Sequence, residues 1–261
     1  MCGRYELSSH PDVIALAFGL PRVPELRARY NIAPTQPIPV VRVDRNGERE
    51  LVEMRWGLVP HWAKDVSIGA RMINARAETV ATSGAFRHAY AHHRCLVPAN
   101  GFYEWQKGAA GKVPHHVGMP DARPFALAGL YEHWRAKDGE VVTSVAIVTT
   151  EAAGEVRGLH DRMPVIVSEH DYGRWLDRGV EDVSDLLAPW SGEPLRIYPV
   201  SKRVNAVEND DASLCEPVSQ ASAEPAPAAG RTRVRAAPGA AAKDEAEADS
   251  VPATPDLFGR D

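Results

Sequence analysis

Residues 124–134 read PFALAGLYEHW and residues 141–150 read VVTSVAIVTT. Both stretches are rich in the β-branched, aromatic and small apolar residues that are typical of buried strands. Lys137-Asp138-Gly139 lies between them and supplies two strong turn residues, aspartate and glycine. We therefore expect the two stretches to form the spine of an antiparallel sheet.

Further strand signals precede this spine. Residues 38–43 and 51–59 are strand-like and flank Arg45-Asn46-Gly47, which predicts a β-hairpin. Residues 95–105 read as a strand, an Asn100-Gly101 turn and a second strand. The expected core is therefore built mainly from strands that follow one another closely along the chain.

Short helices are expected around this core. Residues 9–19 combine a polar capping residue, Pro11 in the first turn, inward apolar residues and Gly19 as the stop. The other expected elements are helices at residues 83–90, 168–176 and 183–187, strands at 165–167 and 195–200, and a loop at 30–35. Together these patterns indicate an α+β protein.

Composition places most of the chain in one domain. The chain has 261 residues, 44% of them hydrophobic, and we expect one domain over residues 1–218. Residues 219–261 are rich in Ala, Pro and Glu and nearly lack large apolar residues, so we expect a disordered tail. The sequence contains neither a run of about 20 apolar residues nor a secretory leader, and we expect a soluble cytoplasmic protein with no membrane contact.

Cysteine usage and charge exclude several classes of protein. The three cysteines, Cys2, Cys95 and Cys215, are odd in number and lack CxxC spacing, which argues against a disulfide framework and a zinc knuckle. The net charge of −5 is unlike that of most nucleic-acid-binding domains, so any such binding requires a local basic cleft.

No metal or cofactor is expected. His88 and His92 are four residues apart on a predicted helix, but no third ligand with recognisable spacing joins them, and no HExxH motif is present. The phosphate-binding motifs GxxxxGK[ST] and GxGxxG are missing from the sequence as well.

The chain begins Met1-Cys2-Gly3-Arg4-Tyr5. Removal of Met1 would give Cys2 a free α-amine beside its thiol, and both groups titrate near pH 8. The two groups on adjacent carbons would form a reagent that an internal cysteine cannot match. The alternative is a buried, inert cysteine near an ordinary start.

Three further positions are candidates for chemistry. Glu104 is flanked by Phe102, Tyr103 and Trp105, and desolvation there would raise its pKa and favour a general acid; the alternative is an edge-strand glutamate in water. His160 lies on a predicted loop before a buried strand, where histidines are often simply solvated. Asn74 shares one face of an extended segment with Arg76 and Glu78, a pattern that usually marks a solvated face.

Four segments carry a specific resemblance: residues 2–5, 74–78, 101–105 and 159–164, with residues 30–34 and 56–60 between them. In this order they resemble the SOS response-associated peptidase (SRAP) domain family over residues 2–217. The resemblance implies a barrel-like antiparallel β core flanked by short helices. It also implies a protein that recognises abasic sites in single-stranded DNA and protects them during the DNA damage response.

The resemblance assigns catalytic roles by position. Cys2 would be the nucleophile, forming a thiazolidine with the ring-opened sugar, and Asn74 would orient the sugar and the terminal amine. Glu104 would act as general acid and base, and His160 would assist proton transfer. Cys2 and Glu104 would also take part in the autocatalytic removal of Met1. Whether an abasic-site lyase reaction by β-elimination competes with ring closure stays open.

The resemblance also indicates the DNA contacts. Arg4, Arg76 and Arg162 match positions near the damaged strand and would contact phosphates, because an abasic site has no base to read. Trp62 and Phe86 are candidate stacking surfaces for flanking bases, and Trp62 is alternatively a core residue. Lys202 and Arg203 would add positive charge at the cleft.

The oligomeric state and one further partner are also predicted. The expected state is a monomer that joins the nucleoid on DNA damage. In the tail, Asp256-Leu257-Phe258 resembles the end of sliding-clamp-binding peptides without their leading glutamine.

Two rival functions remain from the sequence. An N-terminal-nucleophile glutamine amidotransferase also begins Met-Cys-Gly, but its downstream motifs are not found here. A non-catalytic single-stranded DNA-binding adaptor, with Cys2 incidental, is the second.

Overall fold

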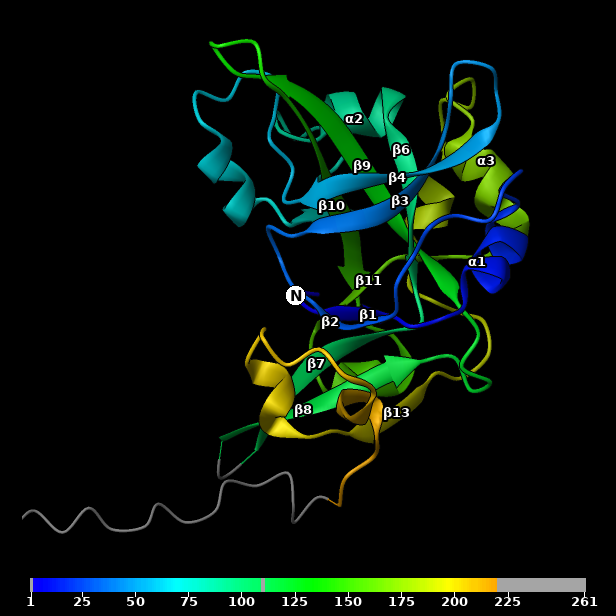
Figure 1. Ribbon diagram of the computed structural model, residues 1–261, viewed down its shortest axis with the longest axis vertical. Coiled ribbons are helices and arrows are strands. Elements are labelled where there is room, and N and C mark those ends of the chain that lie inside the picture. The colour runs from blue at the N-terminus through cyan, green and yellow to red at the C-terminus, as the bar shows by residue number, and fades with distance from the viewer. Residues whose placement is uncertain (1, 109–110, 220–261) are drawn as a thin grey trace, which may run out of the picture. The chain divides into compact units, whose positions relative to one another are not determined.

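The computed structural model describes residues 2–108 and 111–219, whose strands form two sheets (Figure 1). The expected tail and its Asp256-Leu257-Phe258 segment lie outside the described residues. The larger sheet contains β3 (Pro37–Val43), β4 (Arg49–Trp56), β5 (Asn74–Arg76), β6 (Arg94–Ala99), β9 (Phe125–Arg135), β10 (Val141–Glu151), β11 (Arg162–Pro164) and β12 (Ile166–Val167). The smaller sheet contains β1 (Tyr5–Leu7), β2 (Arg29–Ile32), β7 (Gly101–Gly108), β8 (Gly111–Gly118) and β13 (Arg196–Pro199).

The larger sheet closes on itself. Its order is β11-β10-β4-β3-β6-β9-β12, and β10 pairs with β9 as well as with β4, so five strands complete a barrel. The expected spine is confirmed, because β9 and β10 pair in antiparallel register from Arg135↔Val141 to Gly129↔Ile147. The expected hairpin is confirmed by β3 and β4. The α+β class with a barrel-like core is therefore the observed fold.

Strand β10 adds two parallel pairings to this mainly antiparallel barrel. It runs parallel to β4 on one stretch and to β5 on the next, with Ile147 opposite Asn74. Antiparallel β11 extends the same strand, with Glu151 opposite Arg162. One strand thus holds the segments that carry Asn74 and Arg162.

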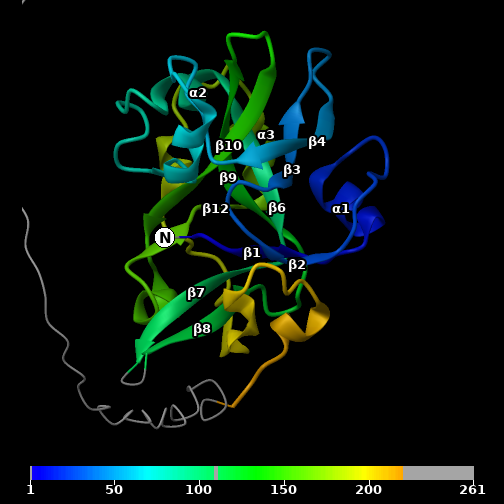
Figure 2. The same cartoon turned by 60° about the vertical axis from the view of Figure 1, so that its left-hand side comes forward.

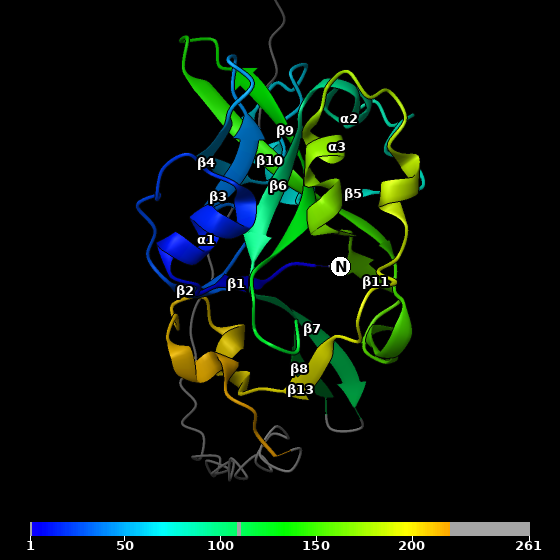
Figure 3. The same cartoon turned by 90° about the vertical axis from the view of Figure 1, so that its right-hand side faces the viewer.

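The smaller sheet has the order β13-β8-β7-β1-β2, and all of its pairings are antiparallel. The loop expected at residues 30–35 is partly wrong, since Arg29–Ile32 forms β2 and pairs with β1. This pairing joins segments more than twenty residues apart, which local turn signals do not report. In Figures 2 and 3, β1 lies between the barrel strands and β7.

Asn100-Gly101 lies between two strands as predicted, but these strands do not pair with each other. Strand β6 ends in the barrel and β7 begins in the smaller sheet, so the chain crosses between sheets at this point. The Asn100 side chain stabilises the crossing by accepting hydrogen bonds from the backbone amides of Ser8 and Ser9, both at 3.0 Å. A Cβ on Gly101 would lie 2.1 Å from His116 Nε2, so this site requires glycine.

Helices cover the outside of the barrel. Helix α1 (Pro11–Phe18) begins at the His10 cap and ends at Gly19, which has φ +60°. Helix α2 (Arg87–His92) starts later than expected because residues 83–86 form turns instead, and α3 (Tyr172–Leu176) is shorter than predicted. The 3-10 helices are Val66–Arg71, Gly154–Gly158, Glu169–Asp171, Ser184–Leu187, Lys202–Asn205 and Ala212–Cys215. None of the helices described is long and apolar enough to cross a membrane.

The main core fills the barrel and the space under β1. Trp56 and Trp175 are fully buried there. The Trp56 ring meets Tyr5 edge-on with centroids 5.5 Å apart, and its Nε1 donates to the carbonyl of Ile73 at 2.9 Å. These contacts fix the start of the chain against the barrel and the segment before β5.

Candidate functional site

Cys2 lies in the enclosed segment that leads into β1. It is fully buried, and its carbonyl oxygen accepts a hydrogen bond from Asn74 Nδ2 at 2.8 Å. Two residues further on, the backbone carbonyl of Arg4 accepts a hydrogen bond from the Tyr103 amide at 2.9 Å. The start of the chain is therefore clamped between β5 and β7.

Glu104 is close enough to Cys2 for its charge to affect the Cys2 thiol. Burial and then the negative charge of Glu104 raise the pKa of the Cys2 thiol, while a hydrogen bond from the Arg4 backbone amide opposes the shift. A buried thiol next to a carboxylate loses its proton less readily than an exposed thiol. Nucleophilic attack from this position requires a base that removes the thiol proton.

Glu104 is 2% exposed, so the edge-strand alternative is wrong. Burial raises its pKa, the direction expected from the sequence. The reason differs in part, because neighbours along a strand point to opposite faces. Tyr103 and Trp105 contribute to a separate cluster with Val200 and Leu214, whereas Phe102 packs into the main core. Glu104 therefore shares its face of β7 with Phe102, and Tyr103 and Trp105 lie on the opposite face.

Asn74 is placed by the pairing of β5 with β10. Its Nδ2 holds Cys2, and its Oδ1 is buried and has no hydrogen-bond partner among the described residues. A buried acceptor without a donor costs free energy unless another group fills the role. The amide is therefore available to orient a donor such as an amine or a sugar hydroxyl.

His160 follows the 3-10 helix Gly154–Gly158. Its Nδ1 accepts a hydrogen bond from the Arg162 amide at 2.9 Å, so the neutral ring carries its proton on Nε2. Burial lowers the pKa of His160, and the positive charge of Lys112 acts in the same direction. Gln106 Nε2 on β7 donates to the Gly158 carbonyl at 3.3 Å, which holds this segment beside the strand that carries Glu104.

Lys112 is a site residue that the sequence analysis missed. It is exposed at the start of β8, and its charge lowers the pKa of both Glu104 and His160. Nothing in the local sequence marks it, because only the β7–β8 pairing brings it near the other groups.

The three predicted arginines have different surroundings. Arg76 is exposed, as a phosphate contact requires. Arg162 makes a bidentate pair with Glu78 at 2.6 and 3.0 Å and donates to the Thr149 carbonyl at 2.6 Å. Arg4 is half-buried and donates to Asn31 Oδ1 and to the Val204 carbonyl, both at 2.7 Å. Its bonds support the fold, and its phosphate contact stays a prediction.

The two predicted aromatic contacts also differ. Trp62 is 52% exposed, which leaves a face for stacking, and its Nε1 donates to the Gly84 carbonyl at 3.2 Å. Phe86 is partly buried against the main core. Of the two added cations, Lys202 is half-buried and Arg203 pairs with Asp211 at 2.7 Å.

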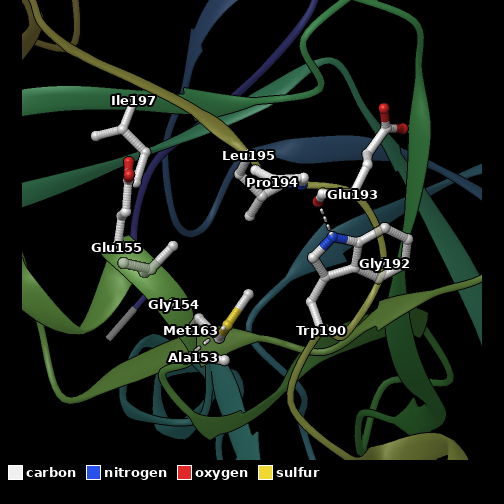
Figure 4. A pocket seen from close by; sticks show the side chains of 11 residues that line it. Ala153, Gly154, Glu155, Met163, Trp190, Gly192, Glu193, Pro194, Leu195 and Ile197 are labelled. Atoms are coloured by element: carbon white, nitrogen blue, oxygen red, sulfur yellow. Dashed lines mark hydrogen bonds between the residues drawn. The ribbon is translucent and has the colours of Figure 1, made fainter.

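An apolar pocket of about 330 Å³ lies away from these groups (Figure 4). Trp190, Met163 and Leu195 line it, and the Trp190 indole donates to the Glu193 carbonyl at 2.9 Å. None of the predicted site residues lines this pocket. The enclosed cluster of Cys2, Asn74 and Glu104, with His160 and Lys112 at its border, is therefore the best candidate site.

Residues 1–207 match the model of the family described as SOS response associated peptidase (SRAP). Abasic site processing protein YoqW of Bacillus subtilis (strain 168) is 38% identical over 223 residues, which are 83% of this chain and 99% of that protein. Abasic site processing protein HMCES of Gallus gallus is 30% identical over 226 residues, covering 74% of this chain and 67% of that protein.

Solved structures share the fold. A protein from Bacteroides thetaiotaomicron has a TM-score of 0.75 at 24% identity and covers 84% of this chain and 100% of its own. A protein from Bordetella bronchiseptica has a TM-score of 0.68 at 26% identity, and the match covers 77% of this chain and 100% of that protein's chain.

Proposed function

Because the chain belongs to the SOS response associated peptidase (SRAP) family, we propose that it processes abasic sites in single-stranded DNA and bonds covalently to the opened sugar through Cys2. The observation that carries this proposal is the enclosure of Cys2 between Asn74 and Glu104. The names of the relatives, abasic site processing proteins, support the substrate class. The family assignment favours this function over a glutamine amidotransferase.

The first step of the proposed reaction frees the amine of Cys2. Water is added across the Met1–Cys2 peptide bond, which releases methionine and leaves an N-terminal cysteine. Glu104 is suited to transfer protons in this hydrolysis, because burial raises its pKa and so favours the acid form over the carboxylate. The bond from Asn74 Nδ2 to the Cys2 carbonyl holds Cys2 in place while this occurs.

The second step joins protein and sugar. Glu104 promotes opening of the abasic deoxyribose to its aldehyde by moving a proton from the C1′ hydroxyl to the ring oxygen. The Cys2 amine adds to the aldehyde carbon and water leaves, which gives an imine. The thiol sulfur then bonds to the same carbon, its proton passes to the nitrogen, and a five-membered thiazolidine results. Neutral His160 has an Nε2–H that can donate to the sugar oxygen freed by ring opening.

The DNA contacts follow from exposure. Arg76 and the guanidinium of Arg162 border the segments that carry Asn74 and His160, and Trp62 offers an exposed ring. A phosphate contact at Arg76 would position the strand without reading its sequence. Arg162 would have to exchange its bidentate pair with Glu78 for such a contact.

The test is incubation of the purified chain with an oligonucleotide that contains one abasic site, followed by a denaturing gel and intact mass measurement. Wild type should give a covalent band, with the mass of the chain lacking Met1 plus DNA minus one water. Cys2→Ala should give none, whereas Cys215→Ser, which removes a different thiol, should still react.

Other outcomes distinguish the alternatives. Binding without any covalent band would support the DNA-binding adaptor and overturn the proposal. A cleaved oligonucleotide beside the band would add a lyase reaction by β-elimination from the imine.

A further inference from the structure

Five of the ten histidines of the chain gather outside the candidate site, on α2, on β9 and in the neighbouring loops. Ring centroids lie 5.1 Å apart for His88 and His92, 5.1 Å for His88 and His93, 5.8 Å for His61 and His88, and 5.9 Å for His93 and His133. None of these residues belongs to the site of Cys2, so the proposed function does not explain them.

Glu132 on β9 contacts two members of this histidine cluster, His88 and His93. It is 3% exposed, and its two carboxylate oxygens lie 2.6 Å from His88 Nδ1 and 3.6 Å from His93 Nδ1. Burial alone would raise the pKa of Glu132, but the interactions of its carboxylate with His93 and His88 outweigh burial and lower the pKa. The carboxylate is thus held ionised at the base of the cluster.

His93 leaves one polar atom unexplained. Its Nδ1 is buried and has no hydrogen-bond partner among the described residues, although it is directed toward Glu132. Such an atom costs free energy unless a further group occupies the space between it and its neighbours. A cation bound by all three groups would satisfy it.

We propose that His88, His93 and Glu132 bind one divalent transition-metal ion, with Zn²⁺ as the ion whose preferences they match. The ligand atoms of these three residues lie within 4.8 Å of one another. Tetrahedral zinc with bonds of about 2.0–2.2 Å to imidazole nitrogen and carboxylate oxygen places its ligand atoms about 3.3 Å apart. The separation between His93 and Glu132 is already close to this, and that between His88 and Glu132 must widen slightly.

The exposure of His88 provides the entry path. Its side chain is 50% exposed, while Glu132 is buried, so an ion from solvent reaches the carboxylate past the exposed imidazole. The ion takes the place of the hydrogen between His88 Nδ1 and Glu132, and the neutral imidazole then carries its proton on Nε2. Water completes the fourth position.

A second group of three metal-binding residue types, Glu6, His116 and Cys215, is less suitable. Glu6 is buried and already accepts hydrogen bonds from Ser8 Oγ and Cys215 Sγ. Burial raises the pKa of Cys215, which disfavours the thiolate that a metal needs. His116 Nε2 lies 3.2 Å from Glu6 in the same group, although neither ring nitrogen of His116 makes a hydrogen bond among the described residues.

The proposed site has a consequence for the surface beside it. Helix α2 supplies His88, β9 supplies Glu132, and His61 lies next to Trp62 on the adjoining loop. Bound Zn²⁺ would therefore fasten the short helix α2 to the barrel next to the exposed indole.

The experiment is calorimetric titration of the full chain, without an affinity tag, with ZnCl₂. Wild type should bind about one equivalent at this site, and His88→Ala and Glu132→Gln should each weaken binding about 10-fold or more. His170→Ala removes an exposed histidine elsewhere and should leave the affinity unchanged. Circular dichroism of the metal-free variants checks that each one is folded.

A second variant excludes the thiols as the ligands. Cys2→Ser and Cys215→Ser should retain zinc binding, and Co²⁺ bound to wild type should show no sulfur-to-metal charge-transfer absorption. Equal affinity of wild type and His88→Ala, loss of binding in either serine variant, or no binding by wild type would each overturn the proposal. None of these results depends on crosslinking to DNA.

Discussion

Asn74 is a barrel residue that contacts the start of the chain directly at Cys2. Its Nδ2 bond to the Cys2 carbonyl is the contact that would hold the nucleophile during reaction. Asn74→Ala should slow crosslinking about tenfold or more, equivalent to about 1.4 kcal/mol of activation free energy. Single-turnover rates with saturating abasic DNA measure this effect. Unchanged rates in a folded variant would remove Asn74 from the mechanism.

Lys112 is an exposed charge that acts on two groups of the site. Its charge lowers the pKa of both Glu104 and His160, so Lys112→Gln should raise both. If crosslinking needs protonated Glu104 and neutral His160, the rate falls above the first pKa and below the second. Both limbs of the pH profile should then shift to higher pH.

The matched control for this prediction lies on the same hairpin. Lys107 pairs directly across from Lys112 and is also exposed. Lys107→Gln removes the same charge from a residue that is not among the main causes of either pKa shift, so its profile should follow that of wild type. Identical profiles for all three proteins would show that Lys112 does not act on the reacting groups.

At the scale of elements, the crossing between the two sheets is the most constrained place. A Cβ at Gly101 would lie 2.1 Å from His116 Nε2 and 3.0 Å from the Val117 carbonyl. Gly101→Ala should therefore lower the free energy of unfolding by about 1–3 kcal/mol, as overpacking does. Urea denaturation measures the change.

Gly84 provides the comparison. No heavy atom lies within 4 Å of a Cβ built there, and its φ is not in the left-handed region. Gly84→Ala should leave stability nearly unchanged. If both variants unfold at the same urea concentration, the crossing is not tightly packed.

The sequence predicted two hairpins whose strands are close along the chain, but it missed β8, which pairs with neighbouring β7, and it misjudged pairings between distant segments. The hairpins β3–β4 and β9–β10 are joined by short turns with Gly and Asn or Asp, and both were confirmed. Strand β2 was taken for a loop because its partner β1 is distant, and Asn100-Gly101 looked like a hairpin turn because the local signal does not say which strands pair.

The same limit applies to the site. Cys2 and Glu104 carry local signals, a position next to the initiator and an acid among aromatics, and the structure places them together. Lys112 carries none, and among the proposed zinc ligands only His88 stands in a recognisable pattern, four residues before His92. His88 and Glu132 are 44 residues apart, and only the packing of α2 on β9 joins them.

At the scale of the whole molecule, charge opposes DNA binding. The chain carries −5, so any attraction to a strand must come from local cations. Binding should therefore weaken steeply with salt, with a slope of about −0.7 for each phosphate contacted on single-stranded DNA. Arg76→Gln should reduce the magnitude of this slope by about one contact, as measured by fluorescence anisotropy across a salt series.

Arg203 serves as the control for that measurement. Its guanidinium is paired with Asp211, so it has little free charge to offer a phosphate. The salt dependence of DNA binding by Arg203→Gln should therefore have the same slope as that of wild type. If Arg76→Gln does not change this slope, the bound DNA strand does not contact Arg76 and must lie away from β5.

The burial of Cys2 also fixes an order of events during synthesis. The groups that surround Cys2 arrive late, since Asn74 follows it by 72 residues and Glu104 lies later still. A ribosome-bound chain that has not yet produced β7 holds no site around its first residues. If these groups remove Met1, the freed terminus appears only after the barrel has closed, and a reactive amine and thiol are never displayed on an unfinished chain.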